Sequence, residues 1–266
     1  MNQALSRLCV VLLVWLAAVL FLPGCQSDTD VAVTELPEVV TTAPTAETQE
    51  TEALLPETIG PPETTLPIPI CPLPLDDWRI RLVNQDHPVS EDLNVSLSHV
   101  RNGIYVDSRC YEDLKAMLHA CRNAGLSPIV CSGYRDLEYQ TGLFQKKVSR
   151  LRADGLSEQE AYLTAQTVVA LPGTSEHHVG LAVDIVDQKY QILDEQQEQT
   201  QVQQWLIEHS WEYGFILRYP SGKSDITKII YEPWHYRYVG QVVAAEIHDS
   251  GLCLEEYLAQ FPSGGL

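Results

Sequence analysis

Two short stretches of this chain hold side chains that bind divalent metal ions. Residues 172–186 (PGTSEHHVGLAVDIV) offer His177 and Asp184, and residues 231–240 (YEPWHYRYVG) offer His235. Histidine nitrogens and carboxylate oxygens are zinc ligands in proteins. Two histidines and one aspartate leave a fourth position open for water, as a catalytic rather than a structural zinc site requires.

Asp184 is expected on a mostly apolar face of a strand, where burying a carboxylate costs free energy. From Leu181 onward the residues alternate as in a strand, which places Asp184 on the same side as Ala182 and Val186. An ionised acid on an apolar face loses more by desolvation than packing returns, unless a cation or several hydrogen-bond donors meet it. Gly180 and the turn at residues 172–173 bend the chain, so we expect His177 to share that cation.

A third stretch, residues 131–140 (CSGYRDLEYQ), precedes these two. On these three motifs, in this order, the chain resembles the VanY-type D-alanyl-D-alanine carboxypeptidases, a zinc family that also contains the hedgehog fold. The resemblance runs from about residue 78 to about residue 240. It implies zinc bound by His177, Asp184 and His235, and an α+β fold with a largely antiparallel sheet flanked by helices.

Glu232 and Arg135 are the expected catalytic residues. Glu232 would take a proton from the attacking water and pass it to the leaving amine, and Pro233 favours an extended Glu232. The alternative for Glu232 is a hydrogen bond to a zinc-binding histidine. Arg135 would stabilise the oxyanion that develops on the scissile carbonyl. The alternative for Arg135 is a structural salt bridge with the neighbouring residues 136 and 138.

The resemblance also implies two residues that bind the terminal carboxylate of the substrate, Ser175 and Gln140. The other histidines are expected to have ordinary packing or surface roles; they are His87, His99, His119, His178, His209 and His248. His178 follows His177 directly, and on an extended chain its side chain would point the other way.

Residues 1–25 have the pattern of a bacterial lipoprotein signal peptide. An apolar run follows Arg7 and ends in Leu22-Pro23-Gly24-Cys25, so Cys25 is the expected lipidation site. The run is short for a transmembrane helix. An ordinary signal peptide and an uncleaved anchor are the alternatives. Each of the three would place the remainder outside the cytoplasm, and lipidation would hold it at the outer face of the cell membrane.

Residues 26–74 are rich in Thr, Pro and Glu, and no Lys or Arg occurs between Arg7 and Arg79. This composition predicts a disordered, extended stalk ahead of a domain at 75–266. The formal net charge of the chain is −19. An acidic balance of this size argues against a nucleic-acid partner and against a polybasic membrane patch.

Five of the seven cysteines lie beyond the lipidation site, so they cannot all pair with one another. We expect Cys121 and Cys131 to be small core residues. A bridge from Cys71 to Cys110 or to Cys253 is a hypothesis.

The chain from residue 78 onward predicts alternating strands and helices without strict βαβ repetition. Expected strands cover residues 79–84, 128–132, 181–186, 213–219, 228–231 and 234–239. Expected helices begin at Asp107 or Ser108, at Asp136, at Ser157 with Glu160 in a capping box, before Trp205, and near Gln241.

The predicted function is a lipid-anchored zinc D,D-carboxypeptidase that removes the terminal D-Ala from peptidoglycan stem peptides. Relatives with the same motifs include L,D-carboxypeptidases that act on tetrapeptide stems, and the residues do not separate the two activities. Two other classes are a cell-wall-binding module with a non-catalytic zinc and a solute-capturing lipoprotein of a transporter. Without an apolar interface helix, a monomer is expected.

Overall fold

A four-stranded antiparallel sheet in the order β3-β4-β6-β5 organises the part of the chain that the structure describes. The structure is a computed structural model that describes residues 70–90 and 93–261. The strands of this sheet are β3 (Pro128–Ser132), β4 (Ala182–Asp187), β6 (His235–Tyr238) and β5 (Phe215–Leu217). The predicted signal segment, Cys25 and nearly all of the predicted stalk lie outside the described residues.

Helices and a hairpin surround this sheet. The hairpin pairs β1 (Leu97–Arg101) with β2 (Ile104–Asp107). The helices are α1 (Tyr111–Asn123), α2 (Leu137–Ala153), α3 (Glu158–Gln166), α4 (Gln201–His209), α5 (Ser224–Thr227), α6 (Gln241–Ser250) and α7 (Leu254–Ala259). No helix within the described ranges is both long enough and apolar enough to cross a bilayer. The predicted α+β fold with a largely antiparallel sheet is confirmed.

The two faces of the sheet have different roles. Val183 and Ile185 on β4, with Tyr236 on β6, belong to the core cluster that also contains buried residues of α1 and α4. Side chains alternate along a strand, so the positions between them point to the opposite face. That face carries Asp184 and His235, which are direct partners in the antiparallel register. The packed face therefore fixes the register that brings these two residues together.

A second core cluster lies under the C-terminal helices. It joins Ile216 of β5 and Val239 to buried residues of α6 and α7, and it includes Ile80 from the start of the described chain. Ile80 sits in a segment that forms no strand, although the alternation at residues 79–84 predicts one. The carbonyls of Arg79 and Arg81 accept hydrogen bonds from the Arg237 guanidinium (3.1 and 2.8 Å) instead of pairing with a strand.

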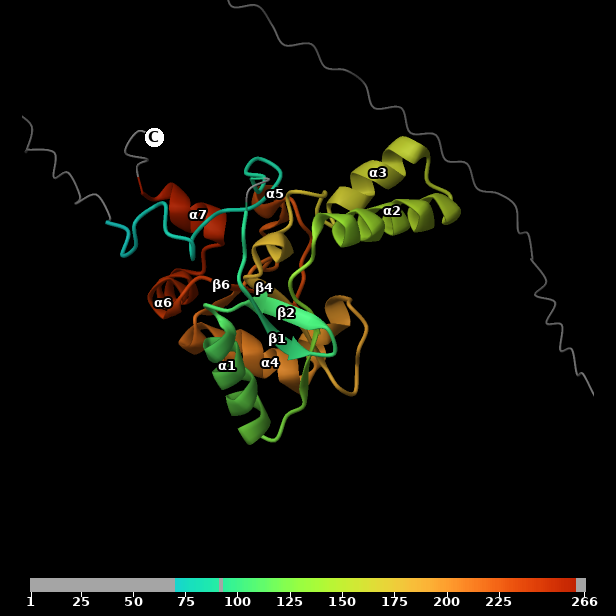
Figure 1. Ribbon diagram of the computed structural model, residues 1–266. Helices are drawn as coiled ribbons and strands as arrows, with labels where there is room; N and C mark the ends of the chain where they lie inside the picture. The colour runs from blue at the N-terminus through green and yellow to red at the C-terminus, as the bar shows by residue number, and fades with distance from the viewer. Residues whose placement is uncertain (1–69, 91–92, 262–266) are drawn as a thin grey trace, which may run out of the picture. The chain divides into compact units, whose positions relative to one another are not determined.

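Helices α2 and α3 form a hairpin that extends away from the sheet (Figure 1). Asp136 caps α2 by accepting from the Tyr139 backbone N–H at 2.7 Å. Ser157 and Glu160 form the predicted capping box of α3. Such caps satisfy the free N–H groups of the first turn, so the boundaries of these helices follow from local sequence.

Two further expectations about the elements are wrong. Residues 228–231 form no strand, because Lys228 takes a left-handed conformation (φ 62°) that ends α5. Helix α1 begins at Tyr111 rather than after a cap at Asp107 or Ser108. The Asp107 carboxylate is occupied by the backbone and guanidinium N–H groups of Arg109, so it does not cap the helix.

The cysteines also depart from expectation. Cys71, Cys110, Cys121, Cys131 and Cys253 are all free thiols, so the hypothesis of a Cys71 bridge is wrong. Cys71 packs against the second core cluster, whereas Cys110 belongs to the first. Cys121 is buried, as predicted, but Cys131 is exposed at the end of β3.

Candidate active site

His177 lies on a short 3-10 helix, η1 (Glu176–Val179), between β3 and β4. Ser175 starts this helix, because its hydroxyl accepts from the His177 N–H at 3.3 Å. Gly180 ends it with φ 67°, a conformation that favours glycine. A Cβ at this position would lie 2.8 Å from the Asp107 nitrogen, so the close approach of the backbones also requires glycine.

A backbone carbonyl sets the orientation of the His177 ring. Its Nδ1 lies 2.7 Å from the Gly133 oxygen, and because a carbonyl only accepts, Nδ1 carries the hydrogen. The other ring nitrogen, Nε2, keeps its lone pair and faces Asp184 at 3.4 Å. A second partner that fixes the ring in this way is typical of metal-binding histidines.

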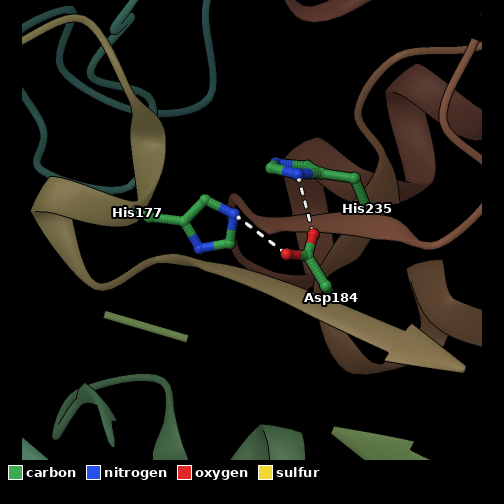
Figure 2. Close-up of side chains that lie close together, drawn as sticks. All are labelled: His177, Asp184 and His235. Carbon is green, nitrogen blue, oxygen red and sulfur yellow. Dashed lines mark ion pairs between the residues drawn. The ribbon is translucent and has the colours of Figure 1, made fainter. Parts of the chain in front are cut away.

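Asp184 and His235 complete a triad of buried side chains (Figure 2). They project from opposed positions on β4 and β6, and His235 Nδ1 lies 3.1 Å from Asp184 Oδ1. The ring of His177 stands nearly edge-on to that of His235, with centroids 5.0 Å apart. The structure thus brings together the three residues that the sequence predicts as metal ligands.

The geometry of the triad fits a zinc ion. One ligand atom from each residue can be chosen so that the three lie within 4.8 Å of one another. Tetrahedral zinc, with bonds of about 2.0–2.2 Å, places its ligand atoms roughly 3.3–3.5 Å apart. Asp184 Oδ1 is buried, and within the described part of the chain its neighbour His235 Nδ1, at 3.1 Å, does not meet it with the geometry of a hydrogen bond. A buried carboxylate oxygen of this kind is satisfied by a bound cation.

Burial and the neighbouring charges shift the pKa values of the three predicted ligands in different directions. Burial lowers the pKa of His177 to about 4, and Arg135 acts in the same direction, so this imidazole is neutral. Burial also acts to lower the pKa of His235, but the carboxylates of Asp184 and Glu176 outweigh it and raise the pKa to about 9. Burial acts to raise the pKa of Asp184, but its contacts with His177 and His235 and the charge of Arg135 outweigh burial and hold the pKa well below its usual range.

Glu232 lies beside the triad, just before β6. Its Oε2 is 3.5 Å from His235 Nδ1, and its backbone N–H donates to the Tyr219 carbonyl at 3.2 Å. Burial raises the pKa of Glu232 to about 8, while His235 and Arg135 oppose the rise. A carboxyl group in an apolar site with a raised pKa is suited to exchanging protons near neutral pH.

Arg135 reaches the triad from the loop after β3. Its Nη2 lies 2.5 Å from Asp184 Oδ2, its Nε donates to Ser132 Oγ at 2.9 Å, and its Nη1 lies 3.4 Å from Gln140 Oε1. The guanidinium pairs with a predicted metal ligand rather than with its chain neighbours at 136 and 138. The oxyanion role of Arg135 stays a prediction, and this position is compatible with it.

Ser175 and Gln140 occupy different environments. Ser175 is 3% exposed and lines the cavity at the triad. Gln140 is fully buried; its amide N–H donates to the Ala170 carbonyl at 2.7 Å while its oxygen faces Arg135. Gln140 therefore positions Arg135 in this structure. The binding of a substrate carboxylate by either residue remains a prediction.

His178 does not point away along an extended chain, because η1 is helical here. Its Nδ1 donates to the Arg135 carbonyl at 2.7 Å, and its Nε2 accepts from the Gly173 N–H at 3.1 Å. Both ring nitrogens are thus occupied by backbone. His178 ties η1 to the Arg135 loop and is not a ligand, as expected.

Glu176 is a residue of the site that the sequence analysis missed. It is buried, its Oε1 accepts from Arg218 Nε and Arg237 Nη1 at 2.7 Å each, and its Oε2 lies 3.9 Å from His235 Nε2. Neither Glu176 Oε2 nor His235 Nε2 has a hydrogen-bond partner among the described residues. The only available signal was an acid next to His177, since its arginine partners are distant in the sequence.

The triad, Glu232 and Arg135 line one cavity of about 450 Å³. Its walls include apolar side chains such as Leu143, Val169 and Trp234. A cavity of this size with a few convergent polar groups has the properties of a small-molecule or peptide site. The cavity holds three buried metal-binding side chains, an acid with a raised pKa (Glu232) and a cation (Arg135). This combination is typical of a metal-dependent hydrolase site.

Comparison with known proteins identifies the class. Residues 103–241, more than half of the chain, match the family model described as VanY, D-alanyl-D-alanine carboxypeptidase. The chain belongs to this family. It is 44% identical over 183 residues to a D-alanyl-D-alanine carboxypeptidase of Enterococcus faecalis, and the match covers 68% of this chain and 66% of that protein. The match therefore spans just under two thirds of that relative's length.

Solved structures agree with this assignment. The chain is similar to the structure of a vancomycin resistance D,D-pentapeptidase VanY mutant from a VanB-type resistance cassette in complex with Zn(II). The two chains are 43% identical with a TM-score of 0.64, and the match covers 68% of this chain and 99% of that chain. The LdcB LD-carboxypeptidase is similar with 34% identity and a TM-score of 0.55 over 68% of this chain and 85% of that chain. The chain is thus a homologue of zinc carboxypeptidases, with the His177, Asp184 and His235 site of the class.

Proposed function

We propose that this protein is a zinc-dependent D-alanyl-D-alanine carboxypeptidase that removes the terminal D-Ala from peptidoglycan stem peptides. The observation that carries the proposal is the buried triad of His177, Asp184 and His235 with Glu232 and Arg135 in one cavity. Membership of the VanY family supports the substrate class.

The side chains divide the reaction among them. His177 Nε2, His235 Nδ1 and the Asp184 carboxylate would hold the metal. A bound zinc ion supplies a Lewis acid that polarises the scissile carbonyl and acidifies the attacking water. Glu232 takes the proton of that water and delivers it to the departing nitrogen of D-Ala. Arg135 stabilises the negative charge that develops on the carbonyl oxygen.

Ser175 is proposed to bind the terminal carboxylate of the substrate, since this residue lines the cavity beside the triad. Gln140 contributes by holding the Arg135 guanidinium, with which its amide oxygen is in contact. A donor group at the carboxylate explains how an enzyme with this site selects the last residue of a peptide.

The test is D-Ala release from a pentapeptide ending in D-Ala-D-Ala, by the wild type and by Glu232→Gln, with bound zinc quantified in both. We expect the wild type to release D-Ala and the variant to keep its zinc while losing at least about 100-fold in rate. Glu138→Gln, which removes an exposed acid on α2, is the matched control. Zinc binding without cleavage of any stem peptide by the wild type would indicate a binding module with a non-catalytic zinc.

An L,D-carboxypeptidase is the second candidate, because the LD-carboxypeptidase named above shares the fold at 34% identity. A tetrapeptide stem with one terminal D-Ala separates the activities. Release from the tetrapeptide alone would replace the D,D-assignment with the L,D-assignment.

We further propose that residues 1–25 are a lipoprotein signal peptide and that Cys25 carries the lipid that holds the protein outside the cytoplasm. The support is the apolar run that ends in Leu-Pro-Gly-Cys. Cys25→Ser should move the protein from the membrane fraction to the medium. Cys9→Ser is the control, because Cys9 lies within the apolar run and is not the expected lipidation site. If both variants and the wild type distributed equally between the membrane fraction and the medium, lipidation of Cys25 would be contradicted.

A further inference from the structure

One face of α2 lines the same cavity as the catalytic residues. Tyr139, Leu143, Lys146, Lys147 and Arg150 are all part of the cavity wall. They follow one another at helical intervals of three or four residues, so they share one face of the helix. The cavity therefore runs from the metal triad onto a helix face whose far half is basic, which we call the basic face (Lys146, Lys147 and Arg150).

The basic face has no internal counterion. None of the ion pairs in residues 70–90 and 93–261 involves Lys146, Lys147 or Arg150. Lys146 and Arg150 are exposed and Lys147 is half-buried. Some other cations of the described residues pair with a carboxylate, for example Lys223 with Glu256, and some, such as Arg122, do not. The basic face differs because it gathers three unpaired cations at the wall of one cavity.

Local helix energetics do not explain the cluster. Basic residues near a helix C-terminus interact favourably with the helix dipole, which accounts for the position of Arg150 in the last turn. Lys146 and Lys147 lie earlier, and like charges three and four residues apart repel each other. Three unpaired cations gathered at one cavity, in a chain of net charge −19, instead suit an anion from outside the protein.

The length of the cavity wall suits a peptide. The rise of α2 from Tyr139 to Arg150 is about 16 Å at 1.5 Å per residue. An extended peptide covers this distance with four to five residues at about 3.3–3.6 Å each. A carboxypeptidase cleaves the last bond of its substrate, so the residues before that bond are the part that can extend along the remaining wall.

We propose that the basic face binds a carboxylate on the residues that precede the scissile bond, so that α2 selects acidic peptides as substrates. The inference rests on the proposed function, since it takes the peptidase site as the place where the substrate ends. The occupant is an acidic peptide because the basic face is continuous with the catalytic cavity.

The experiment compares two matched synthetic pentapeptides ending in D-Ala-D-Ala, with Glu or Gln as the second residue, and a short acyl-D-Ala-D-Ala substrate. The variants are Lys146→Gln/Lys147→Gln/Arg150→Gln and, as the matched control, Arg152→Gln. Arg152 is an exposed cation on the same helix that is not among the cavity-lining residues.

We expect the wild type to prefer the Glu peptide by about fivefold in kcat/KM, the size that a few exposed ion pairs supply. The triple variant should lose this preference and keep the wild-type kcat/KM on the short substrate. Arg152→Gln should behave as the wild type, and 0.5 M NaCl should weaken the preference.

Equal wild-type rates on the two peptides, or a preference that persists in the triple variant, would overturn the proposal. If the wild type cleaves none of the substrates, the proposed function fails. In that case the affinities of the zinc-loaded protein for the Glu and the Gln peptide are compared at equilibrium. A preference for the Glu peptide that the triple variant loses would support the role of the basic face, and equal affinities would overturn it. Binding of anionic phospholipid vesicles that depends on the basic face, without discrimination between peptides, would assign the face to a lipid surface instead.

Discussion

The Arg135 guanidinium contacts three side chains at once, those of Ser132, Gln140 and Asp184. A lysine at this position keeps the charge but loses the planar fork that makes these contacts. The position of the group, rather than its charge alone, therefore decides what it does at the metal site.

Arg135→Lys should lower kcat by about 100-fold with little change in KM, because a misplaced oxyanion donor acts only on the transition state. Steady-state kinetics on a D-Ala-D-Ala peptide measures both constants, and Arg101→Lys, a substitution on β1 outside the cavity wall, is the control. A rise in KM at unchanged kcat would show instead that Arg135 binds the ground-state substrate.

Glu176 is placed to hold His235 in its ligand orientation, because its free Oε2 faces the free His235 Nε2 at 3.9 Å. Metal-binding histidines commonly donate their second N–H to such a carboxylate. Glu176→Ala should weaken zinc affinity by about 10- to 100-fold. Competition with a zinc chelator measures this change, and Glu212→Ala, which removes the acid beside His209 outside the site, should leave the affinity unchanged. An unaltered affinity in Glu176→Ala would exclude this positioning role.

At the scale of elements, the same carboxylate joins η1 to the sheet. Arg218, which follows β5, and Arg237 on β6 are fully buried and both donate to Glu176 Oε1. Arg218 also makes a two-pronged contact with Glu255 on α7, at 2.6 and 2.8 Å. One buried network thus links the helix that carries His177 to the strand that carries His235.

This network makes the fold sensitive to acid. Burial alone would raise the pKa of Glu176, but the charges of Arg218 and Arg237 outweigh it and hold the pKa well below the ordinary 4.5. Because the folded-state pKa is the lower one, the ionised group stabilises the fold fully above about pH 4.5. That contribution declines as the pH falls from 4.5 toward the folded-state pKa, by at most about 1.4 kcal/mol per pH unit.

Glu176→Gln should therefore be less stable than the wild type at pH 7 by about 3–5 kcal/mol, since it leaves buried arginines without their partner. Its stability should also fall less steeply below pH 4.5. Urea unfolding of both proteins in EDTA, with Glu138→Gln as control, measures the two effects. If the free energy of unfolding of Glu176→Gln fell with pH as steeply as that of the wild type, other groups would dominate acid unfolding.

A feature of the fold could be predicted from the sequence where it arises from residues that are close together in the chain. Strand β3, the start of α2, the capping box of α3 and the alternation around Asp184 arise from neighbouring residues, and the structure confirms them. The His177, Asp184 and His235 site was also predictable, because the residue types, their order and the family resemblance agree.

The failures come from partners that are distant in the sequence. Residues 79–84 alternate like a strand, yet their carbonyls bind Arg237, which no local pattern reveals. The role of Glu176 depends on Arg218 and Arg237 in the same way. Cys131 was expected in the core, but it is exposed near the end of β3 and lines the cavity.

At the scale of the whole molecule, the metal site joins segments that the chain brings together only on folding. His177 comes from η1, Asp184 from β4 and His235 from β6. A metal that binds these three residues together binds the folded state and not the extended chain. Its binding free energy therefore adds to the stability of the fold.

Removal of zinc should accordingly lower the Tm, and zinc added back should restore it. At a free zinc concentration 100 times the Kd, the gain is about 2.7 kcal/mol, which raises the Tm of a domain of this size by about 5–10 °C. Thermal unfolding with and without a chelator measures the shift. His235→Ala should abolish the shift, whereas His119→Ala, an exposed histidine on α1, should keep it. A zinc-dependent shift that survives in His235→Ala would mean that the stabilising metal binds elsewhere, and the ligand assignment would then have to be abandoned.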